Sequence, residues 1–475
     1  MVHGSDIMKL PNLENAKERT NKKVEYIYEE NRTSKTLCDQ KYFLKTYGCQ
    51  MNLHDSEEIK ARLESMGALE TMDYTSADIV ILNTCAIREN AHDKVFGFLG
   101  RCKHLKKSKP ELIIGLCGCM AQEENVVEEV MNRHPHIDIV FGTHNINELS
   151  DLLENKNNKQ QIQVYSEEGD VYENILYKRD SNIKAWVNIM LGCNNFCTYC
   201  IVPYTRGKQR SRKCEDIVYE INNLVKDGYQ EVTLLGQNVN SYGIDLIDGK
   251  TFAELLKMVS ETGIKRIRFV TSNPWDFSEE TIQAIASCDN VMPYIHLPIQ
   301  SGSSKTLRLM GRKYTAESYL ELFNKIKCVV PNVSITTDII VGFPNETEED
   351  FLETLKIAES CKFDGAYTFI YSPRAGTPAA KIEDNVDLKT KENRLQRLNE
   401  IIRKYAKINN EKLIGKEISV LIEGTSEKNP NRIFGYTDTM KLVNIDGSRD
   451  LIGKIVEVKI VEAKSFSLYG EVLNI

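Results

Sequence analysis

Hydrophobic and polar positions alternate in blocks over the first third of the chain, where apolar runs of strand length are separated by segments with helical spacing. The strands are expected over residues 42–49, 78–85, 112–119 and 137–142. The helices are expected over residues 56–66, 86–107, 123–132 and 146–153. Continuous apolar strands between helices predict a parallel sheet with helices on both faces. We therefore expect an N-terminal α/β domain over residues 39–155.

The same alternation resumes in the middle of the chain and repeats six times. The strands are expected over residues 186–190, 232–236, 267–271, 294–298, 335–341 and 367–371, with helices between them. Six strand–helix repeats predict a partial (βα)6 barrel, whose working face lies at the carboxyl ends of its strands. A charged amphipathic helix over 393–408 is expected to dock on this barrel. The barrel and this helix together should cover residues 183–411.

The pattern changes to short strands near the C-terminal end. These strands are expected over residues 418–422, 434–437, 442–445, 455–460 and 467–472. They predict a small OB-like β-barrel over residues 412–475, of a class that often holds RNA. The polar segments 1–38 and 156–182 are expected to be a flexible extension and a linker.

Composition narrows the class of protein. A chain of 475 residues with 41% hydrophobic and 27% charged residues is typical of a globular protein of about three domains. The sequence contains no signal-peptide pattern and no bilayer-spanning run, so we expect a cytoplasmic protein without a membrane partner. Cysteines in that compartment more often bind metal or act in catalysis than form disulfides. The net charge of -7 means that an RNA site would have to be a local basic patch.

Three cysteines lie close together in Gly192–Cys200, directly after the first predicted barrel strand. Cys193, Cys197 and Cys200 are separated by three residues and then by two. Thiolates are soft ligands for zinc or iron–sulfur clusters. A cubane held by three cysteines keeps one iron open, which suits the binding of a cofactor or substrate. The alternatives are a zinc site, which usually takes a fourth ligand, and a chance grouping of packed cysteines.

Three further cysteines follow the first three strands of the N-terminal sheet, at equivalent places. Cys49, Cys85 and Cys119 each stand at the carboxyl end of a predicted strand. Because the carboxyl ends of parallel strands open on one edge, the three thiols should converge there as a second site. Cys117 is a rival to Cys119, since it is two residues away on the same strand. The alternative is that all of them are small buried hydrophobes.

Polar residues after the other barrel strands are expected to line a cavity for S-adenosylmethionine (SAM), whose amino and carboxylate groups suit an open iron. The candidates are Gln237, Asn238, Ser272, Gln300, Ser301, Gly342 and Phe343. RNA contacts are expected from the basic run 204–213 and from two aromatic residues of the small β-barrel, for which core filling is the alternative. These candidates are Arg206, Lys208, Arg210, Arg212, Phe434 and Tyr436.

Long motifs in every predicted domain resemble the radical SAM methylthiotransferase family of the MiaB type. They include YGCQMN at 47–52, NTCAIRENA at 83–91, GCNNFCTYCIVPYTRG at 192–207, GQNVNSYG at 236–243, HLPIQSG at 296–302, TDIIVGFP at 337–344 and YSPRAGTPA at 371–379. The first two resemble the branch that acts on N6-(dimethylallyl)adenosine at position 37 of tRNA, next to the anticodon. The branches that modify a ribosomal-protein aspartate or threonylcarbamoyladenosine are the alternatives. A non-catalytic iron–sulfur protein that binds RNA or transfers electrons is the alternative of another class.

The resemblance implies two [4Fe-4S] clusters, a TRAM domain at the C-terminal end and a radical mechanism. Cys193, Cys197 and Cys200 would hold the radical SAM cluster, and Cys49, Cys85 and Cys119 an auxiliary cluster. One SAM molecule would methylate a sulfur on the auxiliary cluster. A second would give a 5′-deoxyadenosyl radical that removes hydrogen from C2 of adenine, so that the product is 2-methylthio-N6-(dimethylallyl)adenosine. An electron donor such as a flavodoxin or ferredoxin and a monomeric state are also expected.

Overall fold

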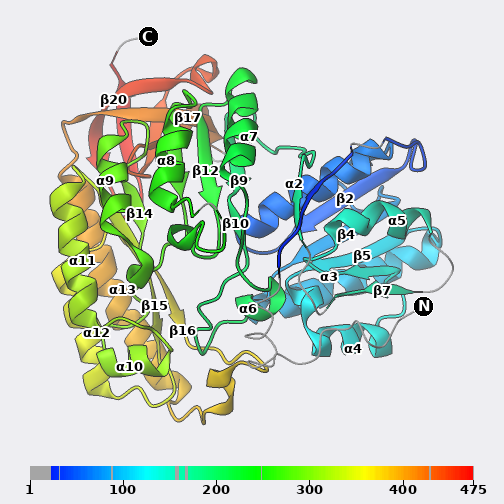
Figure 1. Cartoon of the computed structure of the whole chain (residues 1–475), viewed down its shortest axis with the longest axis horizontal. Helices are drawn as coiled ribbons and strands as arrows, with labels where there is room; N and C mark the ends of the chain where they lie inside the picture. Colours follow the sequence, from blue (N-terminus) through cyan, green and yellow to red (C-terminus); the bar gives the residue numbers. More distant parts are fainter. Residues whose placement is uncertain are drawn as a thin grey trace. The chain divides into compact units, whose positions relative to one another are not determined.

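The computed structural model describes residues 23–30, 33–86, 89–155, 160–165, 170–247, 249–426 and 429–473 (Figure 1). The chain divides into two compact units. Unit 1 contains the chain up to Asp180 together with residues 190–212 and 373–381. Unit 2 contains residues 181–189, 213–372 and 382–475. The Cys193–Cys200 loop therefore belongs to the unit of the N-terminal sheet, although it follows a barrel strand in the sequence.

Unit 1 is built on a six-stranded sheet of order β3-β2-β4-β5-β6-β7, in which all neighbours are parallel. Its strands are β2 (Lys41–Thr46), β3 (Leu69–Glu70), β4 (Ile79–Thr84), β5 (Ile113–Gly118), β6 (Ile139–Phe141) and β7 (Gln161–Gln163). Its helices are α2 (Gln50–Ser65), α3 (Glu89–Ser108), α4 (Glu124–Arg133) and α5 (Leu149–Glu154), with 3-10 turns at Met120–Gln122 and Ile146–Glu148. The expected parallel α/β sheet is confirmed.

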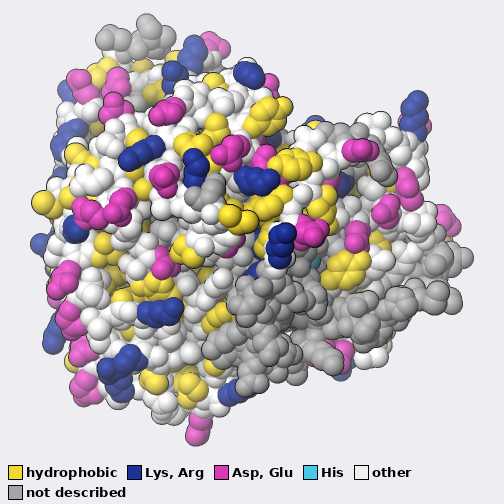
Figure 2. Space-filling model, viewed as in Figure 1, with side chains coloured by type: hydrophobic (Ala, Val, Ile, Leu, Met, Phe, Trp, Pro, Cys, Tyr) yellow, Lys and Arg dark blue, Asp and Glu magenta, His cyan; other side chains and the backbone are white. Residues whose placement is uncertain are grey.

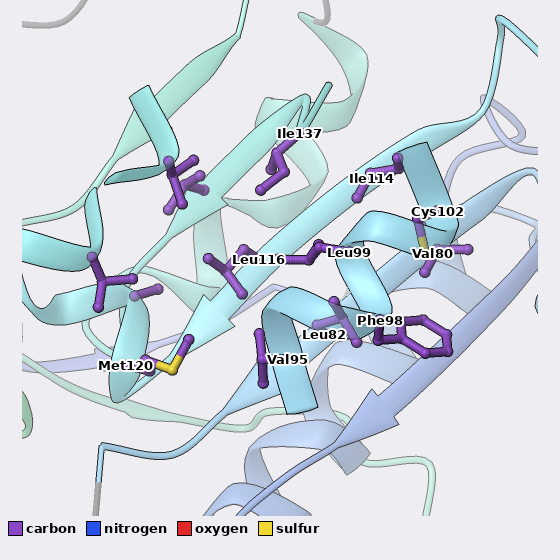
Figure 3. Close-up of a cluster of buried hydrophobic side chains, with 14 of the residues drawn as sticks. Val80, Leu82, Val95, Phe98, Leu99, Cys102, Ile114, Leu116, Met120 and Ile137 are labelled. Carbon is purple, nitrogen blue, oxygen red and sulfur yellow. The ribbon is translucent and has the colours of Figure 1, made fainter. Parts of the chain in front are cut away.

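Helices cover both faces of this sheet. On one face, Phe98 and Leu99 of α3 pack with Leu82 of β4 and Leu116 of β5 (Figure 3). The other face has a separate cluster that includes Tyr42, Ile59, Leu63, Ile81 and Phe141. Burial of each such side chain contributes about 1.5–3 kcal/mol. Strands β4 and β5 are buried along their whole length, which explains why they read as continuous apolar runs.

Two segments that were expected to be irregular form strands in part. Tyr26–Tyr28, within the expected extension, forms β1 and pairs in parallel with β8 (Val171–Glu173) from the expected linker. The linker also supplies β7 at the edge of the sheet. Tertiary pairing therefore gives structure to segments whose own sequence is polar. The rest of the expected extension and linker lies in part outside the described residues, at 1–22, 31–32, 156–159 and 166–169.

Unit 2 contains the partial barrel, as two parallel sheets of order β13-β12-β9 and β14-β15-β16. Its strands are β9 (Lys184–Asn188), β12 (Glu231–Leu235), β13 (Arg266–Phe269), β14 (Tyr294–His296), β15 (Ser334–Val341) and β16 (Gly365–Ile370). Its helices are α7 (Cys214–Lys226), α8 (Phe252–Ser260), α9 (Glu279–Ser287), α10 (Ser304–Leu309), α11 (Ala316–Val329), α12 (Glu348–Cys361) and α13 (Leu388–Glu411). Threonine capping boxes start α8, α11 and α12.

The C-terminal strands form a closed five-stranded barrel of order β17-β18-β19-β21-β20. They are β17 (Glu417–Ser426), β18 (Asn429–Thr437), β19 (Leu442–Asp446), β20 (Ile455–Ala463) and β21 (Leu468–Val472). This small barrel contacts the amino ends of the larger barrel's strands. Arg266, the first residue of β13, donates to the carbonyl of Tyr436 at 2.9 Å, and Lys441 Nζ lies 2.9 Å from Asp364 Oδ1 before β16. It therefore leaves the carboxyl ends of the strands uncovered.

No helix in the described part of the chain combines the length and the hydropathy that crossing a bilayer requires.

Candidate functional site

The Cys193–Cys200 loop is held in a compact turn within unit 1. Cys193 and Cys197 are buried and Cys200 is half-buried. The backbone N–H of Cys193 donates to Gly207 O at 3.1 Å, and that of Cys200 donates to Cys197 O at 3.0 Å. Gly192 has φ +72°, and a Cβ there would lie 1.9 Å from Lys208 O. Only glycine fits at the start of this turn, which places three thiols within eight residues.

The second set of cysteines lies where the strand pattern predicted it. Cys49 and Cys119 are the N-cap residues of α2 and of the 3-10 turn after β5, and Cys85 directly follows β4. Burial raises the pKa of Cys119 to about 12, and Cys85 and Cys49 act on it in the same direction. The three thiols are therefore close enough to interact electrostatically. Cys117 instead belongs to the hydrophobic core of unit 1, which favours Cys119 as the third ligand.

The loop of the Cys193 set packs on the sheet edge of the Cys49 set within unit 1. Ala86 and Cys119 from the sheet edge form a buried apolar cluster with Ile201 and Tyr204, against which Phe196 packs. The loop that carries the Cys193 set thus packs directly on residues beside the Cys49 set. Although their sequences are distant, the fold brings the two candidate cluster sites into one compact region.

A buried ion pair reinforces this contact. Arg206 Nη2 lies 2.5 Å from Asp55 Oδ2, and both side chains are buried. Burial disfavours the charged form of Arg206, but Asp55 and then Cys119 raise its pKa above the ordinary value. Arg206 is therefore a fixed positive charge beside the sulfurs of the Cys49 set.

The donor sets fit an inorganic cluster better than a single ion. Among the described residues, no three His, Cys, Asp or Glu side chains converge tightly enough to chelate one metal ion. A zinc site would need sulfurs at about 2.3 Å from a common centre. A cubane with one open iron requires three thiols, which is the number that each set supplies.

The basic run is not the phosphate-binding surface that its sequence suggested. Its four candidates are between 3% and 8% exposed: Arg206, Lys208, Arg210 and Arg212. Arg206 pairs with Asp55, and Arg212 binds both carboxylate oxygens of Glu173, at 2.8 and 2.6 Å. Arg206 and Arg212 neutralise buried carboxylates from distant parts of unit 1, and the burial of all four side chains leaves no solvated cationic face for RNA.

The exposed helices of unit 2 do not supply such a face either. Over α8, α9, α11 and α12, Lys and Arg side chains alternate with Asp and Glu side chains (Figure 2). Tyr436 was a second candidate for RNA contact, but its carbonyl accepts from Arg266 and its ring lies 5.7 Å from Lys184 Nζ. Tyr436 thus packs in the junction of the two barrels. Phe434 is half-buried beside Gly424, and its contact with RNA stays a prediction.

Three of the SAM candidates lie where a polar ligand is needed, at the carboxyl ends of β12 and β13. Four buried polar atoms there have no hydrogen-bond partner among the described residues: Gln237 Oε1, Asn238 Oδ1, Ser272 Oγ and Asn273 Oδ1. An unsatisfied buried polar group costs about 1–3 kcal/mol, so four of them at one edge indicate a bound polar molecule. The three amide oxygens can accept from the amino group and the ribose hydroxyls of SAM, and the Ser272 hydroxyl can donate to its carboxylate.

The other SAM candidates have structural roles. Ser301 Oγ accepts from Ser303 N at 3.2 Å, and Gly342 N donates to Glu346 Oε2 at 2.6 Å. Phe343 is fully buried and packs edge-to-face on Tyr371. These contacts give the three residues packing and loop-closing roles, and their contact with SAM stays a prediction. Gln300 bridges β15 through its backbone at φ +71°, and its contact with SAM stays a prediction.

The aromatic side chains on the last barrel strand were not among the site residues that the sequence predicted. Tyr367 and Phe369 of β16 are 61% and 49% exposed, and they pair in register with Asp338 and Ile340 of β15. His296 lies on the same face, with Nε2 3.3 Å from Asp338 and its ring against Tyr367. Helix α13 covers the opposite face, where Thr368 Oγ1 donates to Asn399. The aromatic face therefore lines the inside of the open barrel. The sequence signal that could have identified Tyr367 and Phe369 was their position on the last predicted strand of the barrel.

Removal of the Arg206 charge should destabilise unit 1. We expect Arg206→Ala to lower its free energy of unfolding by about 3–5 kcal/mol, because Asp55 would remain buried without a partner. The double variant Asp55→Leu with Arg206→Met should recover most of this loss. Far-UV circular dichroism in urea would measure the free energy of unfolding of each variant.

The matched control is Lys178→Ala in unit 1, whose ion pair with Glu64 is largely exposed and should contribute at most about 1 kcal/mol. Equal losses for the Arg206 and Lys178 variants would contradict a structural role of the buried pair.

Comparisons with known proteins agree with this architecture. Residues 187–358 match the radical SAM superfamily, residues 41–142 the uncharacterized protein family UPF0004, and residues 411–473 the TRAM domain. The fold resembles the radical S-adenosylmethionine methyltransferase TsrM from Kitasatospora setae, with a TM-score of 0.52 and 14% identity over 72% of this chain and 77% of that one.

Two curated relatives are much closer in sequence. The tRNA-2-methylthio-N(6)-dimethylallyladenosine synthase of Staphylococcus aureus strain Newman is 51% identical over 470 residues, which cover 98% of this chain and 91% of the relative. That of strain JH9 is 51% identical over 466 residues, with 97% and 91% covered. The expected family resemblance is confirmed, and the chain belongs to the tRNA-2-methylthio-N(6)-dimethylallyladenosine synthase family.

Proposed function

We propose that this chain transfers a methylthio group to C2 of N6-(dimethylallyl)adenosine at position 37 of tRNA, next to the anticodon. The observation that supports the proposal is the packing of Ala86 and Cys119 against Ile201 and Tyr204, because these residues belong to the segments that carry the two predicted three-thiol sites. Group transfer between two centres requires such proximity. The name of the relatives, tRNA-2-methylthio-N(6)-dimethylallyladenosine synthase, supplies the substrate.

The radical SAM match implies a [4Fe-4S] cluster and SAM, and we assign them to named residues. Cys193, Cys197 and Cys200 would hold that cluster, and Cys49, Cys85 and Cys119 would hold a second one. When bound, these groups supply the radical that removes hydrogen from C2 and the methylated sulfur that replaces it. The chain's own part is to hold the thiols in fixed turns and to keep Arg206 charged beside them.

Two further sets of residues would position the reactants. Gln237, Asn238, Ser272 and Asn273 would bind the polar groups of SAM with their unsatisfied atoms. Tyr367 and Phe369 would stack against the target adenine and contact its dimethylallyl group, since a base must leave its stack to be reached. An electron donor such as a flavodoxin or ferredoxin, a monomeric state and a cytoplasmic location are further predictions from the sequence.

The alternatives make different demands on the site. A methylthiotransferase of threonylcarbamoyladenosine or of a ribosomal-protein aspartate would use the same cysteines, so the relatives decide against it. A non-catalytic iron–sulfur protein would not need four unsatisfied polar atoms at the carboxyl ends of β12 and β13.

The deciding experiment is nucleoside mass spectrometry on isopentenylated tRNA, incubated anaerobically with reconstituted protein, SAM and a reductant. We expect 2-methylthio-N6-(dimethylallyl)adenosine to form. Formation of 5′-deoxyadenosine alone would keep the radical chemistry and refute the substrate. The absence of both products, with intact clusters, would favour a non-catalytic role.

The aromatic face should matter for substrate affinity. We expect Tyr367→Ala with Phe369→Ala to lower kcat/KM for an isopentenylated anticodon stem-loop about 10- to 100-fold, because stacking contributes about 1–3 kcal/mol per base. Tyr219→Ala on α7 is the matched control, since Tyr219 is 67% exposed on the outside of the barrel. An unchanged kcat/KM in the double variant would remove this face from the substrate site.

A further inference from the structure

A pocket of about 410 Å³ in unit 1 belongs to neither cysteine site. It lies between the end of β2 and helix α3, and its lining is Lys45, Tyr47, Asp93, Lys94, Gly97 and Arg101. Three of these six residues are cations. Lys45 and Tyr47 lie four and two residues before Cys49, at and just after the carboxyl end of β2. The pocket therefore includes part of the segment that leads to Cys49.

Among the residues that the structure describes, the three cations have no carboxylate partner. Lys45, Lys94 and Arg101 form no ion pair with any carboxylate of the described residues, in contrast to the buried Arg206 and Arg212. Asp93 lines the pocket as well, but its side chain is 95% exposed and lies 3.9 Å from His92 Nδ1. The pocket thus keeps an excess of positive charge on a chain whose net charge is -7.

The core of unit 1 holds two of these cations in place. Lys45 Nζ lies 4.7 Å from the ring centre of Phe98, and the guanidinium carbon of Arg101 lies 4.8 Å from it. Phe98 is itself buried among the residues of Figure 3. Lys45 Nζ also lies 5.4 Å from the ring centre of Tyr47. Cation–π contacts orient the charges without neutralising them, so they remain available to an anion.

We propose that this pocket binds backbone phosphates of the tRNA that flank the modified nucleoside. Unpaired cations interleaved with an aromatic ring are the feature by which proteins hold an RNA backbone and an adjacent base or sugar. Lys45 and Tyr47 connect the pocket to the Cys49 set through the segment that ends at Cys49. The proposal rests on the proposed function, because tRNA is the polyanion that this enzyme must hold. It replaces the buried run 206–212 as the electrostatic contact with RNA.

Gly97 allows a test that leaves the fold intact. A Cβ at Gly97 or at Gly100 meets nothing within 4 Å, and both residues lie within α3, where glycine is unfavourable. Gly97→Glu would place a carboxylate in the pocket, and Gly97→Gln would place an uncharged side chain of the same shape there. Gly100→Glu would add the same charge to the same helix outside the lining.

Binding of a labelled, isopentenylated anticodon stem-loop to the reconstituted full chain would be measured over a range of salt concentrations. We expect Gly97→Glu, and Lys45→Ala with Arg101→Ala, to weaken binding at least tenfold at low salt. The double alanine variant should also have a shallower slope of log binding constant against log salt concentration, by about 0.7–0.9 for each lost phosphate contact. Gly97→Gln, Gly100→Glu and Lys107→Ala, on the exposed part of α3, should bind as the unaltered chain does.

Several results would overturn the proposal. If the unaltered chain binds the stem-loop and both test variants match it, the pocket is not an RNA contact, while the proposed function stands. If the unaltered chain does not bind any stem-loop, the proposed function is refuted, and the pocket proposal, which rests on it, is refuted as well. A pocket for small anions would show weaker binding of inorganic phosphate in the variants with unchanged RNA affinity. A docking site for an acidic electron donor would show slower reduction by flavodoxin with unchanged RNA affinity.

Discussion

Replacement of Cys193 by alanine should abolish formation of 5′-deoxyadenosine. Segment 190–212 contains only the three cysteines of the Cys193 set, and the next cysteine in the sequence, Cys214, is buried in unit 2. Cys193 is 9% exposed and its backbone is tied to Gly207 O, so neither solvent nor a shift of the loop can replace its sulfur. The variant should keep about four of about eight irons per chain, because the Cys49 set is unaltered.

Anaerobic iron and sulfide analysis with quantification of 5′-deoxyadenosine would measure this effect. Cys328→Ala provides the control, since Cys328 is exposed on α11 and belongs to neither set. SAM cleavage that survives in the Cys193 variant at the level of the control would refute the assignment of the radical SAM cluster.

Replacement of Cys49 by alanine should separate the two halves of the reaction. We expect 5′-deoxyadenosine to form as before, whereas 2-methylthio-N6-(dimethylallyl)adenosine should disappear. Cys117 cannot take over as a ligand, because its side chain is packed in the core of unit 1. The amount of bound iron should again fall by about half.

The same assay with nucleoside mass spectrometry would test this separation, with Cys38→Ala as the control because Cys38 is exposed in unit 1. A Cys49 variant that still makes the methylthio product would show that the second cluster is held elsewhere. A variant that loses SAM cleavage as well would show that the two sites do not function independently.

The strands and both cysteine sets could be predicted because their signals are local. β4 and β5 are buried on both faces and therefore read as apolar runs, and each cysteine stands at the end of such a run. The closed C-terminal barrel was predictable for the same reason, from its short strands. The contacts between the two barrels could not be predicted. They are made by the charged residues Lys184, Arg266 and Asp364, whose partners in the small barrel lie far away in the sequence.

The basic run failed as a prediction because a charge pattern does not show its partners. Asp55 lies 151 residues before Arg206, and Glu173 lies 39 residues before Arg212. Nothing in the run distinguishes a buried, neutralised guanidinium from a solvated one. The pocket of Lys45, Lys94 and Arg101 was not predicted, because its cations come from two elements and form no run in the sequence.

The repeated passage of the chain between the two units restricts how the protein can be divided. A fragment that starts at the first barrel strand would contain every residue of the radical SAM match, yet it would lack the sheet on which its own cysteine loop folds. Ile201 and Tyr204 would lose Ala86 and Cys119, and Arg206 would lose Asp55. The barrel of this enzyme is therefore not an autonomous module. Domain-swapped chimaeras should exchange residues 190–212 and 373–381 together with the N-terminal sheet.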